Sequence, residues 1–351
     1  MGKLTMAVRE TVSSSGRKFG LKELLEIKLN WAKRLYRGVM RRQLLLRSLY
    51  LFPSYVQIEP TSKCNLRCKV CIRSRVKQTA SEDMNFDLFK TIVDQLRQPI
   101  YGTKVVNLTG LGEPFLNPNI IPMVRYAKSK GLHVMLDTNF TKVNEDILKE
   151  TINSELDLLV VSFDGASKKT FEAIRVGAVF DEIVENVKLL LRLKEEMNAK
   201  KPEVVLNSTI REENVYEIPQ LIKMAEDLGV KGIVFMKQAM PGEKYWENSI
   251  FSLIANEKFH SEKIAVKGCL DYMKSVCCVA RSCYITFDGK VLPCYPIYQL
   301  IPREEYGRYE MGDLTKQRFS EIWFSRRYRQ FRKSIVYGAS LPFCESCFAH
   351  K

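Results

Sequence analysis

Tyr55-Val-Gln-Ile-Glu-Pro-Thr-Ser-Lys-Cys64-Asn-Leu-Arg-Cys68-Lys-Val-Cys71 is a short apolar strand pattern that runs directly into three cysteines. The run at 55–59 predicts a β-strand, and the cysteines, spaced CxxxCxxC, fall on the loop that follows it. Parallel α/β sheets carry their chemistry at the carboxyl ends of the strands. These three thiols are therefore the first candidates for a functional site.

Three thiols within eight residues can converge on one metal centre. Zinc would need a fourth ligand nearby to complete a tetrahedron, and none is evident, because the next histidine, His133, falls in a strand pattern. Three thiolates on a [4Fe–4S] cluster would instead leave one iron open to a ligand. The chain has ten cysteines in 351 residues and no secretory signal, so a reducing, cytoplasmic location and metal or redox roles are expected.

Strand and helix patterns alternate downstream of this loop. The predicted strands are 55–59, 105–109, 133–138, 156–163, 204–210 and 232–237, and the predicted helices are 87–98, 120–130, 145–153, 179–198 and 215–228. Such alternation predicts the α/β class with a parallel sheet. The sheet could be open and doubly wound or curved into a partial barrel, and periodicity does not choose between them.

Further motifs stand at successive strand ends. They are Gly110-Leu-Gly112-Glu113-Pro114, Thr138-Asn139-Phe140 and Ser162-Phe-Asp164-Gly165, followed by Arg175 and Asn186. Together with CxxxCxxC, these motifs resemble, in the same order, those of the radical S-adenosylmethionine (radical SAM) enzymes. Phe140 departs from the glycine that is common in that family.

The resemblance covers about residues 53–237 and implies a partial (β/α)6 barrel. It implies that Cys64, Cys68 and Cys71 hold a [4Fe–4S] cluster whose open iron binds S-adenosylmethionine (AdoMet). The residues implied to contact AdoMet are Gly112, Glu113, Pro114, Thr138, Asn139, Ser162, Asp164 and Arg175. The implied reaction is reductive cleavage of AdoMet to a 5′-deoxyadenosyl radical, which abstracts a substrate hydrogen. An electron donor such as ferredoxin or flavodoxin is the implied partner.

Seven cysteines lie beyond residue 240, with a hairpin signal at Asp288-Gly289. The pattern resembles the SPASM or twitch extension of radical SAM enzymes, which binds an auxiliary [4Fe–4S] cluster. The implied ligands are Cys277, Cys294, Cys344 and Cys347, with Cys269, Cys278 and Cys283 as alternatives to Cys277. Since the sequence ends four residues after Cys347, the one-cluster twitch form is expected. A four-thiolate zinc site remains an alternative.

The net charge of +15 is concentrated at the amino end. Residues 1–50 hold twelve Lys or Arg and three Asp or Glu, which gives +9, and 21–52 has the apolar period of an amphipathic helix. A basic helix over residues 20–52 could lie on a membrane surface or pack on the main domain. Nucleic acid is not an expected partner, because the sequence has no nucleic-acid-binding motif. The expected divisions are 1–52, a barrel at 53–240 and an auxiliary-cluster domain at 241–351.

The sequence does not identify a catalytic base or radical quencher. The leading prediction is a radical SAM enzyme for hydrogen abstraction leading to oxidation or C–C or C–S bond formation, on a substrate that could be lipid-linked or membrane-proximal. A radical SAM peptide or tetrapyrrole maturase is the alternative. Taken together, these predictions make the substrate a small molecule, a lipid or a peptide. A non-catalytic iron–sulfur electron carrier is the competing class.

Overall fold

A computed structural model describes residues 49–74, 81–97, 102–237, 261–268 and 281–337, together with three isolated positions, 39, 43 and 339. The chain divides into two compact units, Met1–Leu44 and Leu45–Lys351. The fold described here belongs to the second unit. The predicted basic helix at 20–52 falls almost entirely outside the described residues.

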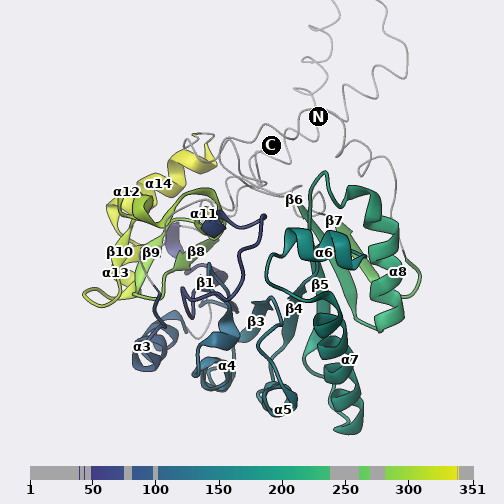
Figure 1. Cartoon of the computed structure of the whole chain (residues 1–351). Helices are drawn as coiled ribbons and strands as arrows, with labels where there is room; N and C mark the ends of the chain where they lie inside the picture. The colour runs from purple at the N-terminus through teal and green to yellow at the C-terminus, as the bar shows by residue number, and fades with distance from the viewer. Residues whose placement is uncertain are drawn as a thin grey trace, which may run out of the picture. The chain divides into compact units, whose positions relative to one another are not determined.

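A single sheet of ten strands forms the centre of the second unit (Figure 1). The strands are β1 (Tyr55–Ile58), β2 (Val105–Leu108), β3 (His133–Thr138), β4 (Leu158–Ser162), β5 (Glu203–Ile210), β6 (Gly232–Lys237), β7 (Ala265–Gly268), β8 (Ser282–Ile285), β9 (Lys290–Leu292) and β10 (Gly312–Asp313). Strands β1 to β7 are parallel and lie in sequence order. A doubly wound sheet would reverse this order. The strands therefore follow the partial-barrel arrangement that periodicity alone left open.

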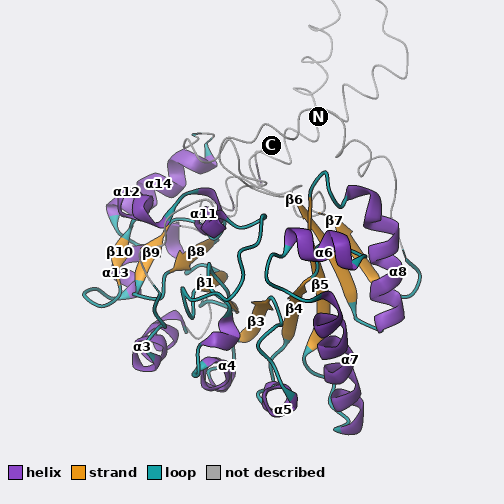
Figure 2. Cartoon of the chain, in the orientation of Figure 1, coloured by secondary structure: helices purple, strands orange, loops and turns teal. Residues whose placement is uncertain are grey.

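The connecting helices lie along one face of this sheet (Figure 2). They are α3 (Phe86–Leu96), α4 (Ile120–Ser129), α5 (Glu145–Asn153), α6 (Lys168–Ile174), α7 (Phe180–Glu196) and α8 (Ile218–Leu228). Side chains set their ends, since Asn85, Asn144 and Ser167 each accept a hydrogen bond from a backbone N–H of the first turn. Helix α8 ends at Gly229, whose φ of 75° is the left-handed conformation that glycine adopts without strain.

The strands alternate between two environments. Val56, Val106, Val134 and Leu206 are buried in the main hydrophobic core, beneath the helices. Because neighbouring residues of a strand point to opposite faces, Gln57, Asn107 and Asp137 face the interior of the partial barrel. Register places Gln57 beside Asn107, so the polar positions gather on that interior face.

Strands β8 to β10 extend the same sheet beyond β1. Strand β8 pairs in parallel with β1, and β9 pairs with both β8 and β10 in antiparallel fashion. The hairpin predicted at Asp288-Gly289 is confirmed, with Gly289 at a φ of 85°. The described residues of this part also form the helices α11 (Ile297–Leu300), α12 (Tyr306–Tyr309), α13 (Phe319–Trp323) and α14 (Arg326–Val336). The boundary at residue 240 stays a prediction, although the sheet itself continues past it.

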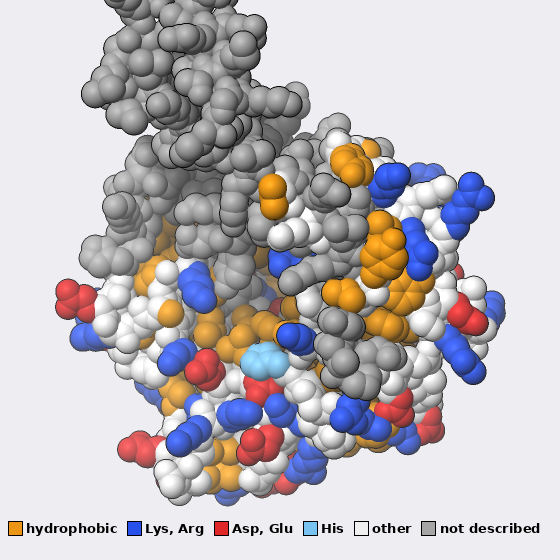
Figure 3. Space-filling view, turned by 180° about the vertical axis from the view of Figure 1, so that it is seen from behind, with side chains coloured by type: hydrophobic (Ala, Val, Ile, Leu, Met, Phe, Trp, Pro, Cys, Tyr) orange, Lys and Arg blue, Asp and Glu red, His pale blue; other side chains and the backbone are white. Residues whose placement is uncertain are grey.

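The described surface carries mixed charge. On the face in Figure 3, Lys and Arg side chains are interspersed with Asp and Glu. Elsewhere on the described surface, Lys and Arg also pair with Asp and Glu, as in the exposed ion pairs Lys149–Glu145 and Lys168–Asp181. Among the described residues, no helix has the length and apolar character needed to cross a membrane.

Candidate functional site

The first of the three loop cysteines, Cys64, comes five residues after the expected strand 55–59, beyond the carboxyl end of β1. Two backbone hydrogen bonds fasten it to the segment that ends α6: Arg67 N donates to Val176 O at 3.0 Å, and Lys69 N donates to Ile174 O at 2.8 Å. Cys71 N also donates to Cys68 O at 3.1 Å. The loop is therefore held by the protein itself, on the turn that also carries Arg175.

The three thiols share one partly desolvated environment. Burial raises the pKa of Cys64 and Cys71, and raises that of Cys68 to about 11. The charge of Cys64 raises the pKa of both Cys68 and Cys71 further. Arg175 and Arg73 act in the opposite direction. Cation attraction and nearby iron would both favour the thiolate forms that bind metal.

Within the described residues, no three His, Cys, Asp or Glu side chains are grouped as ligands of a single metal ion. A four-iron cluster makes a different demand, because each thiolate binds a separate iron. The three thiols on this one loop fit that demand by their number, their chemistry and their common environment.

Glu113 is a buried carboxylate beside this loop. Its Oε1 accepts from Thr138 Oγ1 at 2.5 Å, and its Oε2 accepts from Asn139 N at 2.7 Å. Burial raises the pKa of Glu113 to about 7, against the lowering effect of these hydrogen bonds and of Arg175. The Glu113 carboxyl group thus contacts two other predicted AdoMet residues, Thr138 and Asn139, which come from the end of a different strand.

Gly112 allows two loops to pack closely. A Cβ at Gly112 would lie 2.1 Å from Thr61 O, which no side chain could accommodate without displacing the backbone. Glu113 N donates to Lys63 O at 2.7 Å, directly before Cys64. On the other side, Asn139 Nδ2 lies 3.9 Å from Cys64 Sγ. The Glu113 loop and the end of β3 therefore both contact the cysteine loop.

Phe140 explains how this chain departs from the common Thr-Asn-Gly pattern. Its φ is 59°, in the left-handed region that glycine favours. The ring is fully buried and lies 6.3 Å from that of Phe115. Packing of the ring supports a backbone conformation that costs about 1 kcal/mol or more for a residue with a side chain.

Asp164 and Arg175 form a buried ion pair. Arg175 Nε donates to Asp164 Oδ2 at 2.6 Å, while Asp164 Oδ1 accepts from Thr209 N at 2.6 Å. Both carboxylate oxygens thus bind protein groups, which indicates that Asp164 positions its neighbours. Ser162, at the end of β4, is on the interior face and pairs in register with Asn207 of β5.

The structure describes only part of the predicted auxiliary site. Cys294 is buried, and it packs in a second apolar cluster with Tyr284, Leu292 and Ile297. Cys277, Cys344 and Cys347 lie outside the described residues, as do the alternatives Cys269 and Cys278. Cys283 is fully buried in the main core beneath the sheet, where its surroundings are those of a core thiol.

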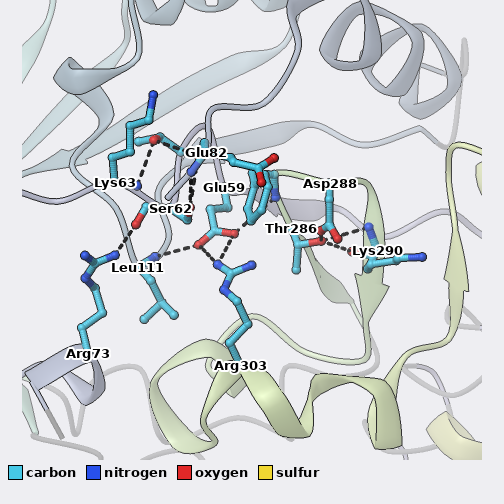
Figure 4. Close-up of polar contacts among 12 residues, drawn as sticks. Glu59, Ser62, Lys63, Arg73, Glu82, Leu111, Thr286, Asp288, Lys290 and Arg303 are labelled. Carbon is cyan, nitrogen blue, oxygen red and sulfur yellow. Dashed lines mark hydrogen bonds and ion pairs between the residues drawn. The ribbon is translucent and has the colours of Figure 1, made fainter. Parts of the chain in front are cut away.

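A buried network joins the end of β1 to the carboxyl-terminal part (Figure 4). The Glu59 carboxylate is fully buried and accepts from Arg303 Nη2 at 2.6 and 2.7 Å, from Leu111 N at 3.1 Å and from Phe287 N at 3.2 Å. Leu111 precedes Gly112, so the network also holds the Glu113 loop. A buried pair of this kind costs desolvation but fixes one geometry.

Sequence reasoning missed Glu59, Arg303 and Asp137. Glu59 carried a signal, since it directly follows the first apolar strand and precedes the cysteine loop. Asp137 also carried one, because an acidic residue interrupts the apolar pattern 133–138 at an interior position. Arg303 carried none, because its partner lies 244 residues away.

Family comparisons match the two regions separately. The model of the radical SAM superfamily matches residues 58–199, and that of the SPASM iron–sulfur cluster-binding domain matches residues 277–348. The second match spans Cys277, Cys294, Cys344 and Cys347. It favours iron–sulfur over the zinc alternative.

Curated relatives match over most of their length. The tungsten-containing aldehyde ferredoxin oxidoreductase cofactor-modifying protein of Pyrococcus furiosus is 28% identical over 84% of this chain and 86% of its own. An AdoMet-dependent heme synthase of Methanosarcina barkeri is 23% identical over 84% and 88%.

Two solved structures share the fold. Streptococcus suis SuiB bound to S-adenosylmethionine has a TM-score of 0.64 at 14% identity and covers 99% of this chain and 81% of its own. AdoMet-bound anSMEcpe has a TM-score of 0.62 at 18% identity, covering 84% and 86%.

Proposed function

Because the chain belongs to the radical SAM superfamily and carries a SPASM-type iron–sulfur domain, we propose that it is a maturation enzyme acting on a cofactor precursor. The chain is therefore an enzyme, and the competing prediction of a non-catalytic iron–sulfur electron carrier is dropped. The substrate class is supported by the cofactor-modifying and heme-synthase relatives, which match more than four-fifths of both chains. A lipid-linked substrate has no such support.

Cys64, Cys68 and Cys71 would hold the [4Fe–4S] cluster. When bound, the cluster and AdoMet supply a 5′-deoxyadenosyl radical that abstracts hydrogen from the substrate. The loop's backbone bonds to Ile174 and Val176 keep the thiols in place. Their partial burial would limit the access of water and oxygen to the site.

Glu113 would bind the ammonium group of AdoMet, and this buried carboxylate is the observation that carries the assignment. Thr138 and Asn139 orient it from the end of β3. Gly112 and Pro114 shape the loop around it, and Ser162 faces the same interior. Asp164 would act through Arg175, which lies between the two residues that are hydrogen-bonded to the cysteine loop, so both are positioning residues.

The SPASM-type domain would bind an auxiliary cluster through Cys277, Cys294, Cys344 and Cys347. Radical SAM chemistry requires a reductant, and a ferredoxin or flavodoxin would serve as electron donor. Peripheral membrane contact through residues 20–52 and a cytoplasmic location stay predictions from the sequence.

Anaerobic reconstitution tests the proposed function. Protein supplied with iron, sulfide, dithionite and AdoMet is expected to form 5′-deoxyadenosine, which chromatography would quantify. Iron and sulfide that bind without any 5′-deoxyadenosine would contradict the assignment. Iron coproporphyrin III and other cofactor precursors can then be screened for faster formation of 5′-deoxyadenosine.

AdoMet affinity is expected to fall about tenfold per pH unit below pH 7 and to level off above it. The reason is that protonation neutralises Glu113, whose pKa is about 7 before the ligand binds. Binding of a cation therefore requires release of that proton at lower pH. Equilibrium dialysis of the reconstituted protein from pH 6 to pH 8.5 measures the effect.

Glu113→Gln is the matching variant. It should lower AdoMet affinity about tenfold to a hundredfold at pH 8, the worth of a charge-assisted hydrogen bond, and remove the pH dependence. Glu150→Gln, on an exposed residue of α5, serves as the control and should behave as the wild type. An unchanged pH profile in Glu113→Gln would assign the titration to another group.

A further inference from the structure

Two polar side chains on the interior face have no role in the AdoMet site described above. Asp137 comes from β3 and Asn107 from β2, and they lie on the face opposite the packed core residues Val134 and Val106. Asn107 is 4% exposed. Asp137 is half-buried, so a ligand inside the partial barrel could reach it.

The hydrogen bonds that Asn107 and Asp137 make leave acceptor oxygens of the two side chains for a ligand. Asn107 Nδ2 donates to Tyr55 Oη at 2.9 Å and to Asp137 Oδ2 at 3.3 Å. The amide orientation is thereby fixed, and its buried Oδ1 has no hydrogen-bond partner among the described residues. Buried acceptors are normally satisfied. In the described part of the chain, the only group that lowers the pKa of Asp137 is Asn107, and no cation does so.

The pair lies close to the cysteine loop. Asp137 is two residues before Asn139, which directly follows β3, a separation of about 7 Å along an extended chain. Asn139 Nδ2 in turn lies 3.9 Å from Cys64 Sγ. A substrate group held by Asp137 would therefore be near the place where the radical forms.

Aromatic side chains line the same interior. Tyr298 of α11 stacks on Tyr284 of β8 with ring centroids 5.1 Å apart and an interplanar angle of 10°. Tyr298 interacts electrostatically with Asp137 and hydrogen-bonds to Gln57. Both rings are buried, so the acceptor oxygens of Asp137 and Asn107 lie beside an aromatic, largely desolvated wall. Such surroundings strengthen a hydrogen bond from a ligand's donor edge.

We propose that Asp137 and Asn107 bind the donor edge of a planar nitrogen heterocycle, with adjacent N–H groups facing the Asp137 carboxylate and the Asn107 amide oxygen. The carboxylate and the amide oxygen are both acceptors, so each can take one of two neighbouring N–H groups of such an edge. The inference deepens the proposed function, on which it rests, by naming the chemistry of the precursor.

The charge of Asp137 determines which ligands it attracts and which it repels. Burial raises the pKa of this carboxyl to about 6, so it remains mostly ionised at pH 7.5. An ionised carboxylate attracts N–H donors and repels ligands that bear carboxylates. Removing the charge should therefore weaken the binding of one class of ligand and strengthen that of the other.

The test is equilibrium dialysis of reconstituted, AdoMet-loaded protein at pH 7.5 against three probes. Pterin has an amino group beside a ring N–H, lumazine has a carbonyl in place of that amino group, and iron coproporphyrin III carries carboxylates. The variants are wild type, Asp137→Asn and, as the matched control, Asp146→Asn, which removes an exposed carboxylate from the first turn of α5.

We expect the wild type and Asp146→Asn to bind pterin more tightly than lumazine. Asp137→Asn should lose about tenfold to a hundredfold in pterin affinity, together with the preference, while its affinity for iron coproporphyrin III rises. Misfolding would lower the affinity for both pterin and iron coproporphyrin III, so opposite changes in the two affinities exclude misfolding as the cause.

Equal affinity for pterin and lumazine in the wild type, or unchanged pterin affinity in Asp137→Asn, would overturn the inference. So would iron coproporphyrin III that binds the wild type no less tightly than it binds Asp137→Asn. Wild-type 5′-deoxyadenosine formation without added precursor judges the proposed function separately, because it needs no occupant at Asp137.

Discussion

Cys64→Ala is expected to reduce 5′-deoxyadenosine formation by more than about a thousandfold, equivalent to about 4 kcal/mol of activation free energy. Cys64 lies beside the end of β3, where Asn139 Nδ2 is 3.9 Å from its Sγ. With only Cys68 and Cys71 left on the loop, one iron of the cluster loses its protein ligand. The measurement is chromatography of anaerobic reaction mixtures together with iron analysis.

Iron content separates this loss from general misfolding. The variant should keep about four of about eight irons per chain, because the auxiliary cluster binds elsewhere. Cys283→Ala provides the matched thiol control: Cys283 is fully buried in the main core, and its removal should cost about 1 kcal/mol of stability without loss of iron. Full 5′-deoxyadenosine formation by Cys64→Ala would show that the loop does not hold the catalytic cluster.

The order of the elements could be predicted because each depends on local pattern. Apolar periodicity places β3 at 133–138 and α5 at 145–153, the bounds that the structure has. Strand order could not be obtained in this way, since β1 pairs with β8 across more than 200 residues. The same reason explains why Arg303 as the partner of Glu59 was missed.

In the candidate site, too, residues in local motifs could be predicted, whereas contacts between separate elements could not. Glu113, Thr138 and Asn139 were predicted by their motifs, and the structure brings them into contact. The sequence did not show that both carboxylate oxygens of Asp164 accept hydrogen bonds from the protein, because the donors Thr209 and Arg175 come from separate elements. Nor did the sequence show that Phe140, with a φ of 59°, keeps the left-handed backbone conformation that glycine favours.

Asp164→Asn is expected to destabilise the apoprotein by about 3–5 kcal/mol, the usual cost of leaving one partner of a buried ion pair alone. Asp164 is fully buried, and its loss would leave the Arg175 guanidinium without its carboxylate at the turn that fastens the cysteine loop. AdoMet affinity and iron content should therefore fall together with stability. Thermal melting and iron analysis measure the two effects.

A double-mutant cycle shows whether the pair acts as a unit. Asp164→Asn/Arg175→Met removes both charges, so it should be less destabilised than Asp164→Asn alone by about 1–3 kcal/mol. Asp181→Asn, which removes one partner of the exposed Lys168–Asp181 pair, should change stability by less than about 1 kcal/mol. Additive losses in the double variant would mean that Asp164 acts through Thr209 and β5. Sub-additive losses with recovered iron would show that the uncompensated Arg175 charge, more than the missing hydrogen bond, causes the defect of Asp164→Asn.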